Sequence, residues 1–457
     1  LTSELCLGDE VHHYRFAKLI YQTGKRVAED PLYANISFHP KYLFVSPPLW
    51  HILLVILWKL TGGISFIVAK IYHSFYYALL ILFTYFLAKE LYTEKEAWYS
   101  AIIIATVPMI ISFSILFYTD IPLTVFTVLC LLMILKNKYL IAGIIAGLMY
   151  LTKTNALFFI PIFIFVILYY NQDTILKKIR YTAYFLATFA CFLIPDMWWR
   201  NINLKSSVVS GFSRLVKTKW NFSVYLNSYL TNPVDLVRYL GMPLLIFIAL
   251  YIIFKRYQKK DLFLWIPIIG YLLISFYFFN FNTDIRYFMP IIPLVVILAS
   301  KSLILLDKKW IKIAFFIICF FQLIVTLAYV NITRRIPQGI KEGFNFIKQN
   351  ISPDALIMYP EENLIEMTER RILWGDMKKY QYLFWLEEDE KAKYIIKSHN
   401  IDYIAVKKSR IYNDSKGHHY GGYSKTLIEK LPTYDFLKLV FENKEIAIWK
   451  VMGGKLK

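Results

Sequence analysis

The polar N-terminal segment of the chain contains two adjacent carboxylates, Asp9 and Glu10, followed closely by two histidines, His12 and His13. A carboxylate within hydrogen-bond reach of a hydroxyl can act as its general base, so the pair is a candidate for group-transfer chemistry. The simpler interpretation is that Asp9 caps a helix, because its side chain can accept from free backbone N–H groups. Neighbouring histidines point to different faces of a helix, so we assign no metal site and keep His12 and His13 only as candidates should a divalent cation bind.

Three further ionisable side chains interrupt apolar sequence. Asp120 stands between two apolar runs, Lys153 divides a run from 139 to 170, and Arg286 precedes another run. Ionisable groups at membrane depth are costly and are therefore candidates for function. Each also has a simpler interpretation: a helix cap for Asp120, a lysine extending to the membrane interface for Lys153, and a local ion pair with Asp284 for Arg286.

The composition is typical of a membrane protein. The 457 residues are 57% hydrophobic and 18% aromatic, and the mean hydropathy is +0.46. The apolar runs are continuous and about 20 residues long, which favours membrane helices over the alternating segments of a β-barrel. A net charge of +20 would suggest a nucleic-acid partner for a soluble protein, but much of it lies in short loops between the runs. We therefore expect a lipid bilayer and no nucleic acid as a partner.

Helices of membrane length account for most of the chain. We expect an amphipathic helix from about residue 9 to residue 24. The apolar helix between Ser46 and Gly63 is too short to cross a bilayer and is interpreted as interfacial or re-entrant. Because the sequence opens in a polar segment, we also expect a first span to precede residue 1. Full spans are predicted at about residues 64–88, 98–118, 121–136, 139–152, 155–170, 181–199, 239–254, 262–280, 287–306 and 313–332.

From Arg334 onward the sequence becomes polar and predicts a small α/β domain. The fold class expected for the whole chain is an all-α polytopic membrane protein, a helical bundle of about 10–11 spans, with this C-terminal extracytoplasmic domain. We predict helices at 339–349 and 389–399 and strands at 355–359, 403–406 and on both sides of 442–445. The expected domains are a first outer loop with the acidic motif (1–63), a transmembrane helical domain (64–332) and the α/β domain (333–457).

The short basic loops predict the orientation of the chain, because Lys and Arg are enriched on the cytoplasmic side. Asp9, Glu10, Asp120, Lys153 and Arg286 then fall together on the opposite side, with the C-terminal tail. The loop at 200–238 is an exception, since it carries six basic residues yet is placed outside; either it binds something anionic, which we prefer, or one span is miscounted. The basic residues that define the cytoplasmic side are Lys136, Lys138, Lys177, Lys178, Arg180, Lys255, Arg256, Lys259, Lys260, Lys308, Lys309 and Lys312.

On these residues the sequence resembles the GT-C superfamily of polytopic glycosyltransferases, and within it the protein O-mannosyltransferases and the lipid A aminoarabinose transferases. The resemblance covers most of residues 8–332, and it departs from the family pattern in the missing first span and in the His12-His13 pair. The motifs that carry it, in chain order, are Asp9-Glu10, Ser46-Pro47-Pro48-Leu49, Thr119-Asp120-Ile121-Pro122-Leu123, Leu151-Thr152-Lys153 and Arg286-Tyr287-Phe288-Met289-Pro290-Ile291-Ile292-Pro293.

The resemblance implies an inverting glycosyltransferase that takes its sugar from a polyprenyl-phosphate carrier at the outer face of the membrane. Asp9 would be the base, and Glu10 would orient Asp9 or bind a sugar hydroxyl, although the two roles could be exchanged. The departing phosphate needs cations where its charge accumulates, which Lys153 and Arg286 could supply. Asp120 would hold the sugar or the acceptor. Arg200 and Tyr287 complete the expected donor site.

Two other functions fit the same composition. A lipid-linked sugar flippase would use buried charges as a pathway and would need no base, but such transporters often consist of two related halves, which this sequence lacks. A polysaccharide or oligosaccharide ligase of related fold is the other alternative. The acceptor hydroxyl could belong to a glycan, a lipid or a protein, and no cofactor is assigned, although a divalent cation stays open.

Overall fold

The chain folds into two compact units. The helical unit comprises residues 46–333, and the α/β unit comprises residues 334–457 together with the N-terminal segment 2–45. The predicted first outer segment, residues 1–63, is therefore divided between them. The computed structural model describes residues 8–32, 46–170, 172–204, 239–253, 258–278, 285–304, 309–333, 335–359, 361, 363–374, 394, 396, 398, 400–408, 411–412, 423–424 and 429–452.

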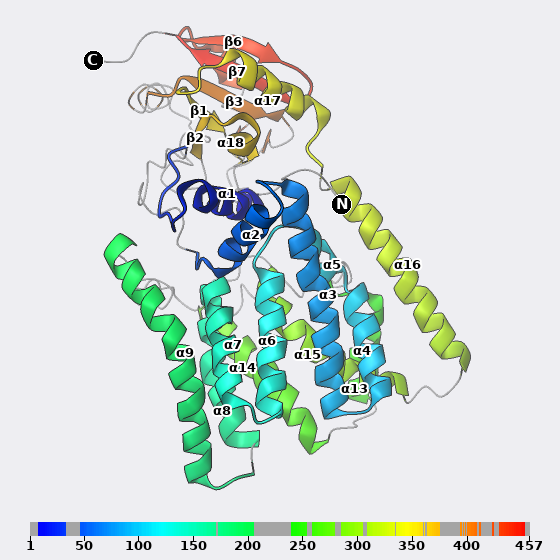
Figure 1. Ribbon diagram of the computed structural model, residues 1–457. Helices are drawn as coiled ribbons and strands as arrows, with labels where there is room; N and C mark the ends of the chain where they lie inside the picture. Colours follow the sequence, from blue (N-terminus) through cyan, green and yellow to red (C-terminus); the bar gives the residue numbers. More distant parts are fainter. Residues whose placement is uncertain are drawn as a thin grey trace. The chain divides into compact units, whose positions relative to one another are not determined.

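The helical unit is a bundle of mostly antiparallel neighbours (Figure 1). Helix α3 packs against α4 and α6, α6 against α7, and α7 against α9, while α4 packs on α15 and α8 on α14. Its elements are α2 (Leu49–Leu60), α3 (Phe66–Leu91), α4 (Glu94–Thr106), α5 (Pro108–Ile115), α6 (Asp120–Leu135), α7 (Tyr139–Thr152), η1 (Thr154–Phe158), α8 (Phe159–Tyr170), α9 (Ile175–Leu204), α13 (Met242–Ile253), η2 (Lys259–Asp261), α14 (Leu262–Phe278), η3 (Ile285–Ile291), α15 (Ile292–Ile304) and α16 (Lys309–Thr333).

These helices confirm the predicted fold class of a multi-pass helical membrane protein, with shorter individual segments than expected. Among the described residues, Phe66–Leu91 and Lys312–Ile332 are long and apolar enough to cross a bilayer alone. A third span would be the pair α4 and α5, which is bent by 58°. Helix α2 has 12 residues, or about 18 Å of length, which is too short for a hydrocarbon core of about 30 Å. This length agrees with the interfacial or re-entrant interpretation of that segment.

Two glycines allow α7 and α9 to approach closely. A Cβ atom at Gly143 would lie 2.0 Å from Thr188 Oγ1, and one at Gly147 would lie 2.3 Å from the Phe192 ring. This small-xxx-small spacing lets helix backbones meet without a hydrophobic driving force, as in other membrane helix pairs. The Thr188 hydroxyl donates across the contact to the Leu140 carbonyl at 3.1 Å. The α7–α9 contact fixes the end of α7, where Lys153 follows.

At the opposite end of the bundle, a buried ion pair ties several helices together. Lys301 Nζ lies 2.7 and 2.8 Å from the two carboxylate oxygens of Asp261. The Tyr92 hydroxyl donates to the same carboxylate at 2.5 Å and that of Tyr251 at 2.9 Å. The carboxylate therefore joins the ends of α3, α13 and α15 to η2. A buried charge satisfied by this many donors serves to hold the bundle together, and no group-transfer chemistry is assigned to it.

The α/β unit is built on a five-stranded sheet of order β2-β1-β3-β7-β6. Strands β2, β1 and β3 run parallel, whereas β7 is antiparallel to β3 and forms a hairpin with β6. The predicted strands at 355–359, at 403–406 and on both sides of 442–445 are confirmed, and the predicted helix 389–399 lies mostly outside the described residues. The elements are α1 (Gly8–Thr23), α17 (Gln338–Asn350), β1 (Leu356–Tyr359), α18 (Asn363–Thr368), β2 (Arg371–Trp374), β3 (Tyr403–Lys407), β4 (Ile411–Tyr412), β5 (Tyr423–Ser424), η5 (Leu431–Thr433), β6 (Leu437–Glu442) and β7 (Ile446–Val451).

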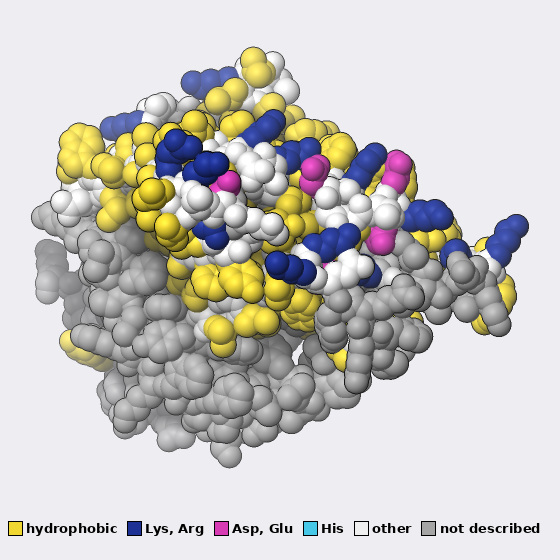
Figure 2. All heavy atoms as spheres, turned by 90° about the horizontal axis from the view of Figure 1, so that it is seen from below, with side chains coloured by type: hydrophobic (Ala, Val, Ile, Leu, Met, Phe, Trp, Pro, Cys, Tyr) yellow, Lys and Arg dark blue, Asp and Glu magenta, His cyan; other side chains and the backbone are white. Residues whose placement is uncertain are grey.

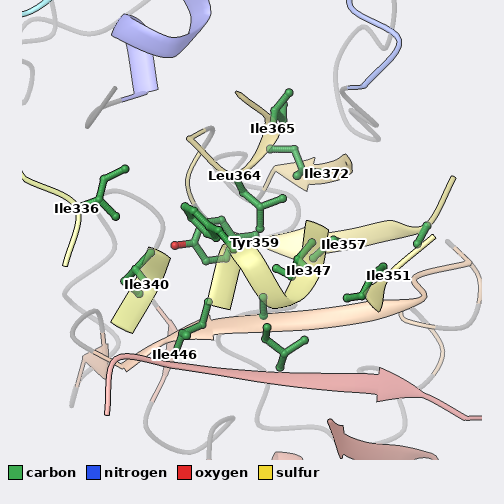
Figure 3. Packing of buried hydrophobic residues seen from close by; sticks show 14 residues of the cluster. Ile336, Ile340, Ile347, Ile351, Ile357, Tyr359, Leu364, Ile365, Ile372 and Ile446 are labelled. Atoms are coloured by element: carbon green, nitrogen blue, oxygen red, sulfur yellow. The ribbon is translucent and has the colours of Figure 1, made fainter. Parts of the chain in front are cut away.

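Both faces of this sheet are covered by apolar side chains. Helix α17 contributes Ile340, Phe344 and Ile347 to the cluster on one face. Figure 3 shows Ile340 and Ile347 in this cluster. The i, i+4, i+7 spacing of the three residues is that of an amphipathic helix, which confirms the predicted helix at 339–349. On the other face, Trp449 packs with residues that include Tyr434. The unit therefore has its own hydrophobic core on each side of the sheet.

Candidate active site

Asp120 and Lys153 form an ion pair between neighbouring helices of the helical unit. Lys153 ends α7 with an extended backbone (φ −153°, ψ 130°), whereas Asp120 is the first residue of α6. Because α6 and α7 are antiparallel neighbours, these two ends meet, and Lys153 Nζ lies 2.5 Å from Asp120 Oδ1. The side chain of Asp120 is 2% exposed and that of Lys153 is 18% exposed. The capping interpretation of Asp120 receives no support, since its carboxylate pairs with the lysine instead of with α6 backbone N–H groups.

Arg286 contacts two tyrosine rings, one of which connects it to this pair. Its guanidinium carbon lies 4.9 Å from the centre of the Tyr118 ring and 5.5 Å from that of Tyr287. The Tyr287 ring also lies 5.3 Å from Lys153 Nζ, so one aromatic ring contacts both cations. Such contacts hold a cation in place without neutralising it. We refer to Tyr118, Asp120, Lys153, Arg286 and Tyr287 as the cation cluster.

The backbone of η3 is fixed from a neighbouring helix. The Tyr271 hydroxyl of α14 donates to the Tyr287 carbonyl at 2.8 Å. Segment η3 also packs against α6, which begins at Asp120. The residues of the cation cluster thus come from the start of α6 and the two residues before it, from the end of α7 and from η3.

The cation cluster contains charged groups of both signs. One is the carboxylate of Asp120, and the two cations are Lys153 and Arg286. Asp120 Oδ2 is buried and has no hydrogen-bond partner in the part of the chain that the structure describes. A buried acceptor without a donor is costly, so this oxygen is suited to a ligand hydroxyl or a water molecule. The cluster therefore combines two cations with one acceptor oxygen that lacks a donor among the described residues.

Arg200 belongs to a second polar group, at the end of α9. Its Nε lies 2.6 Å from Asp196 Oδ2, to which the Tyr150 hydroxyl also donates at 2.7 Å. Arg200 is 5% exposed, and its Nη2 is buried without a partner among the described residues. The predicted loop at 200–238 was wrong at its start, because residues 200–204 continue α9, and residues 205–238 lie outside the described residues. Arg200 is thus a buried cation whose Nη2 has no partner among the described residues. Its place in the donor site stays a prediction.

The acidic pair lies in the first turn of α1, within the α/β unit. Asp9 is exposed, whereas Glu10 is fully buried. Carboxylates in the first turn interact favourably with the positive end of the helix dipole. The exposure favours Asp9 over Glu10 as the group that meets a substrate. Because the pair and the cation cluster belong to different units, their cooperation in one site stays a proposal.

The two histidines follow the acidic pair on α1. The rings of His12 and His13 lie edge to face, with 5.7 Å between their centres. Burial lowers the pKa of His12 to about 4, although Asp9 and Asp30 act in the opposite direction. His12 is therefore neutral at pH 7. Among the described residues, no group of three or more His, Cys, Asp or Glu side chains could hold a metal ion.

The structure adds residues that sequence reasoning did not assign. Tyr118 stands next to the Thr119-Asp120 motif, so its position in the sequence was a usable signal. Tyr271 lies within an apolar run and carries no local signal. Only the structure shows its part in the site, which is the hydrogen bond that its hydroxyl donates to the Tyr287 carbonyl.

Comparison with known proteins identifies one sequence family and several solved structures. Residues 45–199 match the family described as dolichyl-phosphate-mannose-protein mannosyltransferase. A comparison with curated proteins finds no match. ArnT from Cupriavidus metallidurans, solved with bound undecaprenyl phosphate, is 12% identical, with a TM-score of 0.67 over 98% of this chain and 94% of ArnT.

Two further structures are similar to the chain. The oligosaccharyltransferase AglB from Archaeoglobus fulgidus, solved with an inhibitory peptide and a dolichol-phosphate, is 15% identical, with a TM-score of 0.64 over 88% of this chain. The chain spans 65% or 66% of that enzyme in two of its structures, which is less than two thirds of its length. The mycobacterial arabinofuranosyltransferase AftD is 14% identical, with a TM-score of 0.55 over 100% of this chain and 40% of AftD. At identities this low, the structural similarity establishes a common fold and nothing beyond it.

Proposed function

We propose that this chain, which has the predicted fold of the GT-C superfamily of membrane glycosyltransferases, moves a sugar from a polyprenyl-phosphate carrier to an acceptor hydroxyl. The observation that carries the proposal is the cation cluster, where Lys153 and Arg286 lie beside a buried carboxylate at the ends of apolar helices. Lipid phosphates are the ligands in the similar structures of ArnT and AglB. Two cations at the ends of apolar helices are suited to binding a phosphate at the membrane surface.

The proposed reaction is a single displacement at the anomeric carbon. The acceptor oxygen forms a bond to that carbon while the bond to the carrier phosphate oxygen breaks, and the acceptor proton passes to Asp9. Glu10 orients Asp9 or binds a sugar hydroxyl. The departing phosphate monoester is a weak base, so no general acid is required. Its developing charge is stabilised by Lys153 and Arg286, while Asp120 Oδ2 accepts from a hydroxyl of the sugar or the acceptor.

The reaction is proposed to take place on the extracytoplasmic side. Figure 2 shows Lys and Arg side chains gathered at the end of the helical unit that it faces. The described basic residues of the α6–α7 connection, of the first turns of α9 and of η2 support a cytoplasmic location for that end, because positive charge is retained there during insertion. The ion pair of Asp120 and Lys153 is formed at the other ends of α6 and α7.

This orientation predicts one-sided labelling of the α/β unit. Lys444 is exposed in the turn between β6 and β7. A Lys444→Cys variant, in a chain whose own four cysteines are replaced, is expected to react in intact cells with a maleimide that cannot cross the membrane. Reaction only after the cells are permeabilised would invert the orientation.

The transfer itself predicts consumption of a carrier-linked sugar. Purified protein should be incubated with a panel of polyprenyl-phosphate sugars and candidate acceptors, and the free polyprenyl phosphate measured. We expect one donor to be consumed with equimolar glycosylation of an acceptor. Movement of an intact donor across liposomes containing the protein, with no cleavage of its sugar–phosphate bond, would identify a flippase and refute the transferase.

A further inference from the structure

A buried ion-pair network fixes the helix that carries the acidic pair within the α/β unit. Arg15, on α1, binds the Asp30 carboxylate with two nitrogens, Nε at 2.5 Å and Nη2 at 3.0 Å. The side chains of Arg15 and Asp30 are 5% and 0% exposed. A guanidinium bound through two nitrogens to one carboxylate defines the orientation of both groups. Asp30 lies in the segment that follows α1, so this contact holds the helix against the chain that leaves it.

The same network continues into the C-terminal part of the chain. Arg15 Nη1 lies 3.1 Å from Glu366 Oε2, and Lys18 Nζ lies 2.9 Å from Glu366 Oε1. Glu366 belongs to α18, and its side chain is 13% exposed. One carboxylate thus pairs with two cations of α1 across 351 and 348 positions of sequence. Since Arg15 and Lys18 are three residues apart, both lie on one face of α1, and that face is the one attached to α18.

A backbone hydrogen bond adds a third attachment. Ile372 N donates to the Leu32 carbonyl at 2.9 Å, which connects the segment after α1 to strand β2. Leu32 N in turn donates to Asp30 Oδ1 at 3.0 Å, so the carboxylate that binds Arg15 also orders this segment. Helix α1 is therefore held by α18 and β2 of the α/β unit through both side chains and backbone.

The network lies less than two turns of helix from the acidic pair. Six positions separate Asp9 from Arg15 on α1, which is about 9 Å along the helix axis. A rotation of the helix by one residue would turn each side chain by about 100°. Catalytic groups must be held to within about 0.5 Å by surrounding contacts. The ion pairs of Arg15 and Lys18 fix the rotation of α1 about its axis, and this rotation determines where Asp9 and Glu10 point.

We propose that Arg15 and Glu366 are positioning residues for transfer: they make α1 part of the α/β unit, and this unit holds the acidic pair in its working orientation. The proposal rests on the proposed function, in which Asp9 is the base. It assigns the C-terminal domain a direct part in turnover, because loosening α18 would displace the base while leaving the phosphate-binding cations of the helical unit unchanged.

The test replaces Glu366 with its neutral isostere. Glu366→Gln removes the charge that pairs with Arg15 and Lys18 and keeps the side-chain shape. We expect kcat to fall about tenfold or more, since small misplacement of a catalytic group is costly, while the KM for the donor changes by less than about twofold. Arg15→Lys, which keeps the charge and loses the two-nitrogen contact, is expected to have a smaller effect on kcat. Glu369→Gln is the matched control, because within the described ranges Glu369 pairs with Lys18 alone, at 3.3 Å, and is 63% exposed.

Two further measurements separate positioning from a general loss of structure. In an Asp9→Asn background, Glu366→Gln should lower the residual rate no further, because residues that act as a unit are not additive. Amide hydrogen exchange of residues 8–23 should be faster in Glu366→Gln than in the wild type or in Glu369→Gln. Unchanged exchange, an unchanged kcat, or an equal loss of rate in the Asp9→Asn background would each overturn the proposal. If the wild type transfers no sugar, the proposed function fails, and the exchange measurement still decides whether Glu366 holds α1.

Discussion

Asp9→Asn is expected to lower kcat for sugar transfer by about 10²–10⁴-fold, the usual contribution of a positioned general base. An amide cannot accept the proton that the acceptor hydroxyl must lose. Asparagine nevertheless keeps the size of the side chain and can still occupy the first turn of α1. Donor binding should be unaffected, because the phosphate is proposed to bind at Lys153 and Arg286 in the helical unit. The measurement is single-turnover transfer with saturating donor, alongside equilibrium binding of the same donor.

Glu10→Gln provides the matched comparison for Asp9→Asn. Glu10 is fully buried while Asp9 is exposed, so Glu10 is expected to act on orientation, and its loss should reduce kcat less. The opposite ranking, with Asp9→Asn close to wild-type turnover and Glu10→Gln inactive, would exchange the two roles. Wild-type turnover in both variants would remove the acidic pair from the reaction. If both variants were also expressed at a lower level, a folding defect could explain the loss of turnover. Retained binding of the donor excludes such a defect.

The positions of most helices could be predicted from the sequence, because apolar runs and their end signals are local. Helix α1 was expected from about residue 9 to 24 and spans Gly8–Thr23. The chain leaves it at Gly24, whose positive φ of 71° favours glycine. The predicted span 98–118 was wrong in one respect, because it is broken between α4 and α5. Pro108 lacks a backbone N–H and restricts the preceding residue, so Val107 is extended and the axis bends there.

Pairings between distant side chains could not be predicted in the same way. The sequence marked Asp120 and Lys153 separately, but their contact depends on which helices are neighbours and on where α7 ends. The pairing of Arg15 with Glu366 spans 351 positions and has no local signal on either side. Glu366 lies in a six-residue helix of a polar tail, where a carboxylate is ordinarily solvated. Sequence patterns identify costly polar residues, whereas the fold decides which of them meet.

Lys153→Ala and Arg286→Ala are each expected to lower kcat/KM by about 10²–10³-fold, comparable to removing one oxyanion-stabilising donor. In both variants the donor should also bind more weakly, because the cation contacts the phosphate before and during transfer. The two replacements differ in their effect on stability. Lys153→Ala leaves Asp120, 2% exposed, buried without its cation, which can cost about 3–5 kcal/mol. Arg286→Ala removes contacts to the Tyr118 and Tyr287 rings, each worth about 0.5–2 kcal/mol.

A double variant separates the loss of the fold from the loss of the phosphate site. Asp120→Asn combined with Lys153→Met removes both members of the buried pair, which is often neutral for stability when shape is kept. We expect the double variant to recover the thermal stability that Lys153→Ala loses while its transfer activity stays low, because the cation is still missing. Unchanged donor binding and kcat in both Lys153→Ala and Arg286→Ala would refute the cation cluster as the phosphate site. Recovery of full activity in the double variant would show that Lys153 serves only to neutralise Asp120, and Arg286 alone would then remain to receive the departing phosphate.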